Sequence, residues 1–61
     1  MTHAYAACML LEHGPLTFRE FHEITGWSEP VADKIIRILL KRRHIERVVL
    51  PECHRWAYRL A

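Results

Sequence analysis

Two segments with helical spacing of apolar residues, separated by a turn, occupy the stretch from Thr17 to Arg43. In the first segment, Phe18, Phe21 and Ile24 recur every three residues, which predicts an apolar stripe along one side of a short helix. Gly26 follows, and glycine readily adopts the left-handed backbone that a sharp turn between helices requires. The stretch therefore predicts two helices joined by a tight turn.

The second helix of this pair has an unusually lopsided distribution of side chains. Ser28 stands where a hydroxyl caps a helix, and Glu29 and Pro30 both suit a first turn. Apolar residues cover about 200° of the helix circumference: Val31, Ala32, Ile35, Ile36, Ile38, Leu39 and Leu40. The remaining arc, called the polar strip below, contains Asp33, Lys34, Arg37 and Lys41. One face is predicted to be core, and the polar strip is left to meet a partner.

The residues before this stretch predict another helix and a very short strand. Thr2 is placed to cap a helix that runs to about His13, and Gly14 followed by Pro15 is a strong stop signal. Apolar residues surround most of this helix, so it either packs on more than one side or touches a second copy of the chain. Leu16 and Thr17 are expected to form a one-bridge strand, and Thr17 with Glu20 matches the capping-box pattern of a helix start.

The C-terminal part changes to the pattern of a β-hairpin. Residues 45–50 are rich in β-branched and aliphatic side chains, residues 51–54 supply a turn, and residues 55–60 alternate with period two. This alternation predicts that one set of side chains faces the helices, namely Trp56, Tyr58 and Leu60. The other set is predicted to face outward, namely Arg55, Ala57 and Arg59.

Length and charge limit the class of protein. The chain has 61 residues, 51 % of them hydrophobic and 26 % charged, which predicts one compact domain over residues 1–61. No apolar run approaches the roughly 20 residues of a membrane span, and no signal-peptide pattern is present, so the chain is expected to be soluble and cytoplasmic. The net charge is only +2, but basic residues concentrate in the C-terminal half and acidic residues in the first half.

The order helix, short strand, helix, turn, helix and hairpin resembles the winged helix-turn-helix domain of bacterial and phage regulators. The segments that carry the resemblance are residues 10–17, residues 25–32, Ile45-Glu46-Arg47 and residues 56–60. It implies an α+β fold, mainly α, in which a three-helix bundle carries a C-terminal hairpin wing. Two features depart from the usual pattern. Arg43 and His44 stand where a glycine and an aliphatic residue are common, and Glu29 and Val31 replace polar residues at the start of the recognition helix.

The resemblance further implies that the third helix enters the major groove of double-stranded DNA while the wing lies on the backbone. The expected DNA contacts are Ser28, Lys34, Arg37, Lys41, Arg42, Arg47 and Arg55. The expected function is a small transcriptional regulator, or a phage or plasmid accessory factor, acting on the nucleoid of a bacterial or phage-infected cell.

Two alternatives to this function stay open. The polar strip is also typical of a solvated helix face. The same fold also serves as a protein-interaction module, which would dock on a replication, transcription or nuclease partner. A homodimer contact through the first helix and the apolar edge of the third, formed by Val31, Ile35 and Ile38, is a further expectation.

Metal binding and catalysis are not expected. Cys8 and Cys53 lack metal-ligand spacing, and Cys53 with His54 offers only an adjacent pair at the wing tip. No nucleophile, base and acid stand at a recognisable spacing, and no phosphate-binding glycine loop is present, so neither an enzyme nor a cofactor or small-molecule substrate is expected. Trp27 and Trp56 are predicted to serve packing rather than base stacking.

Overall fold

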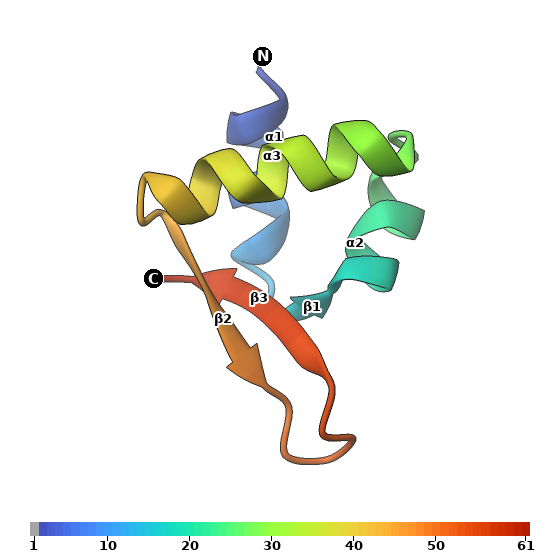
Figure 1. Cartoon of the computed structure of the whole chain (residues 1–61), viewed down its shortest axis with the longest axis vertical. Helices are drawn as coiled ribbons and strands as arrows, with labels where there is room; N and C mark the ends of the chain where they lie inside the picture. The colour runs from blue at the N-terminus through green and yellow to red at the C-terminus, as the bar shows by residue number, and fades with distance from the viewer. Residues whose placement is uncertain (1) are drawn as a thin grey trace.

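The computed structural model describes residues 2–61 and consists of three helices and a three-stranded antiparallel sheet (Figure 1). The elements are α1 (His3–Leu11), β1 (Leu16–Thr17), α2 (Phe18–Thr25), α3 (Glu29–Lys41), β2 (Ile45–Val49) and β3 (Trp56–Leu60). The strand order is β1-β3-β2, so the last strand lies in the centre of the sheet. The hairpin β2–β3, the wing, extends away from the helices (Figure 1). This arrangement confirms the predicted fold.

The first helix begins as predicted and ends slightly earlier. The Thr2 hydroxyl accepts a hydrogen bond from the Tyr5 backbone N–H at 3.1 Å. The helix ends at Leu11 rather than near His13, because the His13 N–H donates to the Leu10 carbonyl three residues back. This tighter bond closes the last turn and replaces the α-helical pattern. None of the helices in residues 2–61 is long and apolar enough to cross a membrane.

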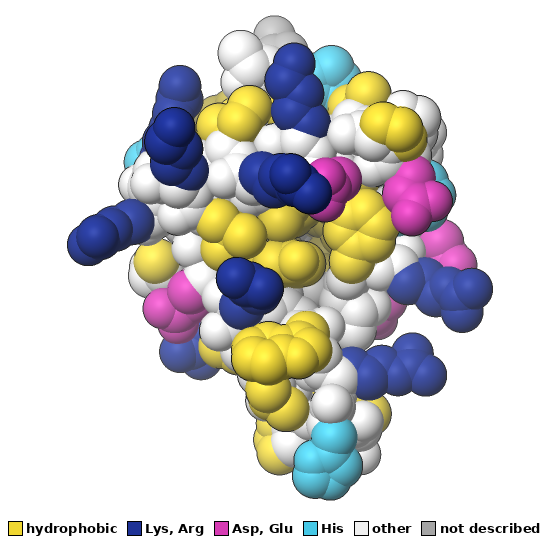
Figure 2. Space-filling model, in the orientation of Figure 1, with side chains coloured by type: hydrophobic (Ala, Val, Ile, Leu, Met, Phe, Trp, Pro, Cys, Tyr) yellow, Lys and Arg dark blue, Asp and Glu magenta, His cyan; other side chains and the backbone are white. Residues whose placement is uncertain are grey.

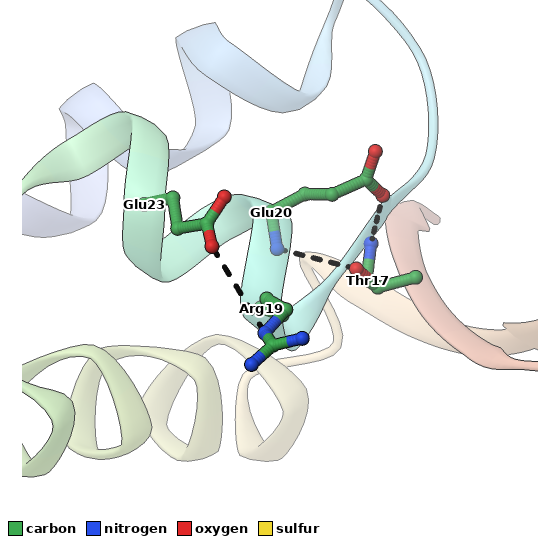
Figure 3. A network of polar contacts seen from close by, with 4 residues as sticks. All are labelled: Thr17, Arg19, Glu20 and Glu23. Carbon is green, nitrogen blue, oxygen red and sulfur yellow. Dashed lines mark hydrogen bonds and ion pairs between the residues drawn. The ribbon is translucent and has the colours of Figure 1, made fainter.

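A capping box fixes the start of α2 (Figure 3). The Thr17 hydroxyl accepts from the Glu20 N–H at 3.2 Å, and the Glu20 carboxylate accepts from the Thr17 N–H at 3.0 Å. The bond from the Thr17 N–H to the carboxylate is the largest cause that lowers the pKa of Glu20, the Thr17 side chain is the second, and the positive charge of Arg55 adds a smaller lowering. At the other end Gly26 has φ 72°, the left-handed turn that the sequence predicts.

The core is one cluster to which all three helices and β2 contribute. Its largest fully buried side chains are Phe21, Ile36 and Leu39. Trp27 packs edge-on against Phe21 with ring centroids 5.7 Å apart, which confirms its predicted packing role. The predicted stripe on α2 is wrong at Ile24, which is 58 % exposed. Residues three apart drift by about 60° around a helix, so a core centred on Phe21 cannot also cover the last turn.

The hairpin pairs in the register Ile45↔Leu60, Arg47↔Tyr58 and Val49↔Trp56. These three pairs share the face of the sheet that packs on the helices, and Tyr58 and Leu60 contact the core there, as predicted. Trp56 lies on the same face but is 64 % exposed, because it stands beyond the helices, where β1 no longer pairs with β3.

Ala57 also departs from the predicted alternation, since it is fully buried on the opposite face. Its two cross-strand neighbours in the central position of the sheet are Thr17 and Val48, which flank the small methyl group. Arg59 on this face is exposed, as predicted, and its guanidinium lies 2.6 Å from the Glu46 carboxylate.

The chain leaves α3 sharply, although no glycine is present. Arg43 has a left-handed backbone with φ 61°, and the His44 N–H donates to the Leu39 carbonyl at 3.0 Å. The Arg43 N–H donates to the Leu40 carbonyl at 3.1 Å, which completes the Schellman pattern of a helix end. An arginine therefore occupies a position that usually takes glycine, at a cost in backbone strain.

Replacing Arg43 with glycine should raise the stability of the fold. The substitution removes the strain of a left-handed non-glycine residue, which costs about 1 kcal/mol. Urea unfolding of the Arg43→Gly variant should show a higher midpoint than that of the wild-type chain. The matched control is Arg42→Gly, at a helical position with φ −83°, where glycine should lower the midpoint. Equal losses at both positions would contradict the strain argument.

The capping box should make stability depend on pH through Glu20. Its pKa is lower in the folded chain than in the unfolded chain, so the stabilisation is complete above the unfolded pKa, which is near 4.5. It is then lost as the pH falls through the folded value. Urea unfolding at pH 7 and pH 3 should show a smaller loss for Glu20→Gln, which keeps the hydrogen-bonding shape without titrating. An equal loss in both proteins would count against this assignment.

Candidate nucleic-acid interface

The polar strip of α3 is exposed on the side away from the core. Lys34, Arg37 and Lys41 follow one another at spacings of three and four residues, and all three are exposed. Ala32, Ile36 and Leu39 on the other side of the helix are buried, so the core fixes which way the strip points. The helix therefore presents three cations in a row.

Asp33 forms an ion pair within the strip. Its carboxylate lies 2.8 Å from Nε of Arg37, one helical turn along. The Arg37 side chain remains 78 % exposed, and an exposed pair of this kind contributes little to stability. Arg37 is thus oriented by Asp33 but free to take another anion in its place.

The start of α3 carries unsatisfied donors. Ser28 occupies the N-cap position with ψ 154°, but its side chain forms no capping hydrogen bond, which corrects the predicted cap. The acceptor of an N-cap serves the second or third amide of the helix; Pro30, the second residue, has no N–H, and the Val31 N–H donates no bond to the Ser28 side chain. The exposed Ser28 hydroxyl is consequently available at the positive end of the helix dipole.

The wing carries a further exposed cation. Arg47 is exposed and pairs across the strands with Tyr58, on the sheet face that packs on the helices. Figure 2 shows Lys and Arg side chains over α3 and around the wing, with apolar and acidic side chains between them. The structure therefore aligns three of the predicted residues, Lys34, Arg37 and Lys41, in one row on α3 and exposes a fourth, Arg47, on the wing.

The other two predicted arginines lie apart from this group. Arg42 follows the strip by about 100° around the helix and lines a small depression beside α1 with Tyr5 and Cys8. Arg55 lines a groove at the start of α2 with Thr17 and Glu20. The period-two pattern did not reveal this, because Arg55 precedes the first residue of β3 and lies in the connecting loop.

Arg19 is a basic residue that the sequence analysis did not select. It is exposed in the first turn of α2, lines the same groove as Arg55 and lies 3.9 Å from the Glu23 carboxylate (Figure 3). Its position inside the capping box, between Thr17 and Glu20, was the available signal, since an exposed cation there stands beside the amides of a helix start.

The described residues offer little for metal binding or disulfide formation. No group of three or more His, Cys, Asp or Glu side chains in residues 2–61 lies close enough to hold a metal ion. Cys8 and Cys53 are both free thiols, the first half-buried beside α3 and the second exposed near the wing tip. The exposed row of cations on α3 is the feature of the structure that most clearly suits a binding partner.

Comparison with known proteins supports the fold. No protein-family model matches the sequence, and no curated protein matches it. Among solved structures, the chain is similar to the reduced form of the transcriptional regulator YodB from B. subtilis, with a TM-score of 0.85 and 27 % sequence identity. The alignment covers 100 % of this chain and 62 % of that chain.

The chain therefore spans only 62 % of the length of the regulator that it matches. A match to a regulator agrees with the expectation that the chain is not an enzyme. The order of the elements, the sheet topology and the structural match together show that this chain has the winged helix-turn-helix fold of a bacterial transcriptional regulator.

Proposed function

We propose that this chain binds double-stranded DNA and acts in transcriptional regulation, with α3 in the major groove and the wing on the neighbouring backbone. The observation that carries the proposal is the exposed row of Lys34, Arg37 and Lys41 on α3, together with the exposed Arg47 on the wing, in a fold similar over its whole length to a transcriptional regulator. A helix that enters a DNA groove needs cations that reach the phosphates, and it needs a fixed orientation. The row on α3 supplies the cations, and the core fixes the helix.

The dimensions of the molecule suit a duplex. Its longest axis is 33 Å, with α3 toward one end and the wing toward the other (Figure 1). One turn of B-DNA is about 34 Å, and its major groove is about 12 Å wide, enough for a helix. A chain that inserts α3 into the major groove would therefore hold its wing over the adjacent minor groove.

Each predicted residue has a role in this arrangement. Lys34, Arg37 and Lys41 meet base edges or phosphates, and Arg47 meets the backbone beside the wing. Ser28 and the free amides at the start of α3 suit a phosphate. Arg42 and Arg55 lie outside the row on α3, so they serve at most the flanking backbone.

Removing cations from the polar strip should weaken duplex binding. Anisotropy of a labelled duplex should report lower affinity for Arg37→Ala and Lys41→Ala than for the wild-type chain. The slope of log affinity against log salt should become shallower by about one for each phosphate that is no longer neutralised. Arg59→Ala is the matched control, because Arg59 pairs with Glu46 on the other sheet face. Retention of wild-type affinity by both strip variants, or no binding by the wild-type chain at low salt, would contradict the proposal.

A second surface supports self-association. Tyr5 and Met9 on α1 are 56 % and 43 % exposed, and Val31 on α3 is 37 % exposed. Ile35 and Ile38, on the same edge of α3, are only half-buried. We propose a homodimer through α1 and this apolar edge, which would suit a palindromic DNA site. The alternative is that the same surface docks on a protein of replication or transcription, or on a nuclease.

Polar substitutions on this edge separate the alternatives. The double variant Val31→Ser, Ile38→Ser should be monomeric in sedimentation experiments where the wild-type chain is dimeric, and its duplex affinity should fall because two linked copies bind better than one. Ile24→Ser, also exposed but on α2, is the control and should stay dimeric. A monomeric wild-type chain whose duplex affinity survives the double substitution would rule out the dimer and leave the surface to another protein.

The proposed place of action is the cytoplasm, on the nucleoid. The similarity to a bacterial regulator supports this proposal. The phage or plasmid origin stays a prediction.

A further inference from the structure

The wing carries a large apolar side chain that nothing in the described chain covers. Trp56 is 64 % exposed, the highest value among the exposed large hydrophobic residues. Its cross-strand neighbour Val49 is 47 % exposed, and the two share one sheet face with Arg47. The wing therefore presents an apolar pair beside a cation on one face of the hairpin.

The fold gives Trp56 no packing role. The chain contains two tryptophans, and Trp27 packs edge-on against both Phe21 and His3. Trp56 takes part in none of the aromatic contacts or side-chain hydrogen bonds found within residues 2–61. Exposed tryptophans of this kind are enriched in binding surfaces, where the ring supplies contact area and the N–H a donor.

We infer that Trp56 is a DNA-contact residue of the wing, whose indole ring packs on the wall of the minor groove next to the major groove that takes α3. This inference rests on the proposed function and adds a binding residue to it. The groove wall is formed by deoxyribose rings and base edges, which offer apolar surface for the ring and acceptors for the indole N–H. Apolar side chains are used in this way by many minor-groove proteins.

Charge decides in favour of a duplex over another occupant. Arg47 lies on the same wing face as Trp56, and Lys34, Arg37 and Lys41 form the exposed row on α3, the helix that enters the major groove under the proposed function. The acidic side chain within the strip, Asp33, is already paired with Arg37. An apolar ring framed by cations suits a polyanion that has apolar surface between its phosphates, which describes a nucleic-acid groove.

Tryptophan fluorescence can test this contact directly. The Trp27→Phe variant leaves Trp56 as the single tryptophan, and the probe is a 20-base-pair duplex of mixed sequence at low salt. Binding of the duplex should quench Trp56 emission and reduce its quenching by acrylamide. Trp56→Ala should lower duplex affinity about tenfold, a loss typical of an aromatic anchor in an interface. Ile24→Ala, a 58 % exposed apolar residue on α2, is the matched control and should bind as the wild-type chain does.

The outcomes separate this inference from the proposed function. If anisotropy shows duplex binding while Trp56 emission and acrylamide access stay unchanged, the inference is wrong and the proposed function stands. If the duplex is not bound, both are wrong. If a single strand of the same sequence protects Trp56 more than the duplex does, the ring binds unpaired bases. If protection rises with protein concentration in the absence of DNA, the ring contacts a second copy. Either result overturns the inference.

A reciprocal variant guards against misfolding. Trp27 packs on the core, so Trp27→Phe needs a check by circular dichroism. If Trp27→Phe unfolds, the emission of the Trp56→Phe variant is subtracted from that of the wild-type chain to obtain the emission of Trp56. The Trp56→Phe variant should stay folded, because Trp56 lies outside the core cluster.

Discussion

The packing of α3 against the core determines how the rest of the molecule is presented. Ala32, Ile36 and Leu39 are among the few buried residues, so the helix cannot rotate about its axis without exposing much of the core. The same contacts that stabilise the fold thus fix the direction of Lys34, Arg37 and Lys41. A small protein can in this way hold a rigid cationic row, because the fixing contacts lie on the opposite side of the same helix.

The short strand β1 ties the wing to the helices. Thr17 pairs with Ala57 in the central strand and also caps α2, so one residue links the sheet to the start of a helix. Its neighbour Leu16 pairs with Tyr58 and packs against the core. Two residues therefore set the angle between the wing and the helices. Under the proposed function, α3 and the wing can contact one duplex at the same time only if this angle is held.

The sequence was sufficient for features that depend on local chemistry. The capping box at Thr17 and the left-handed turn at Gly26 follow from single residue types and were predicted correctly. Ser28 stands at the predicted N-cap position, but its side chain forms no capping bond, which the N-cap preference alone does not reveal. Periodicity placed Trp56 on the correct face, but only tertiary structure shows that the helices end before they reach it. Arg55 is exposed as predicted, but it lies in the loop before β3 rather than within the strand.

The charge of one copy is modest for a DNA-binding protein. The net charge is +2, and Asp33 inside the polar strip partly offsets Arg37, so phosphate attraction alone would hold a single chain weakly. The first turn of α3, with Glu29 and Val31, offers few groups for base readout. Two features of the fold compensate for this under the proposed function. The exposed ring on the wing adds contact that salt does not screen, and the apolar surface of α1 and α3 would join two copies, so that the second binds at high effective concentration. On this argument, affinity depends on both exposed apolar surfaces as much as on the cations between them.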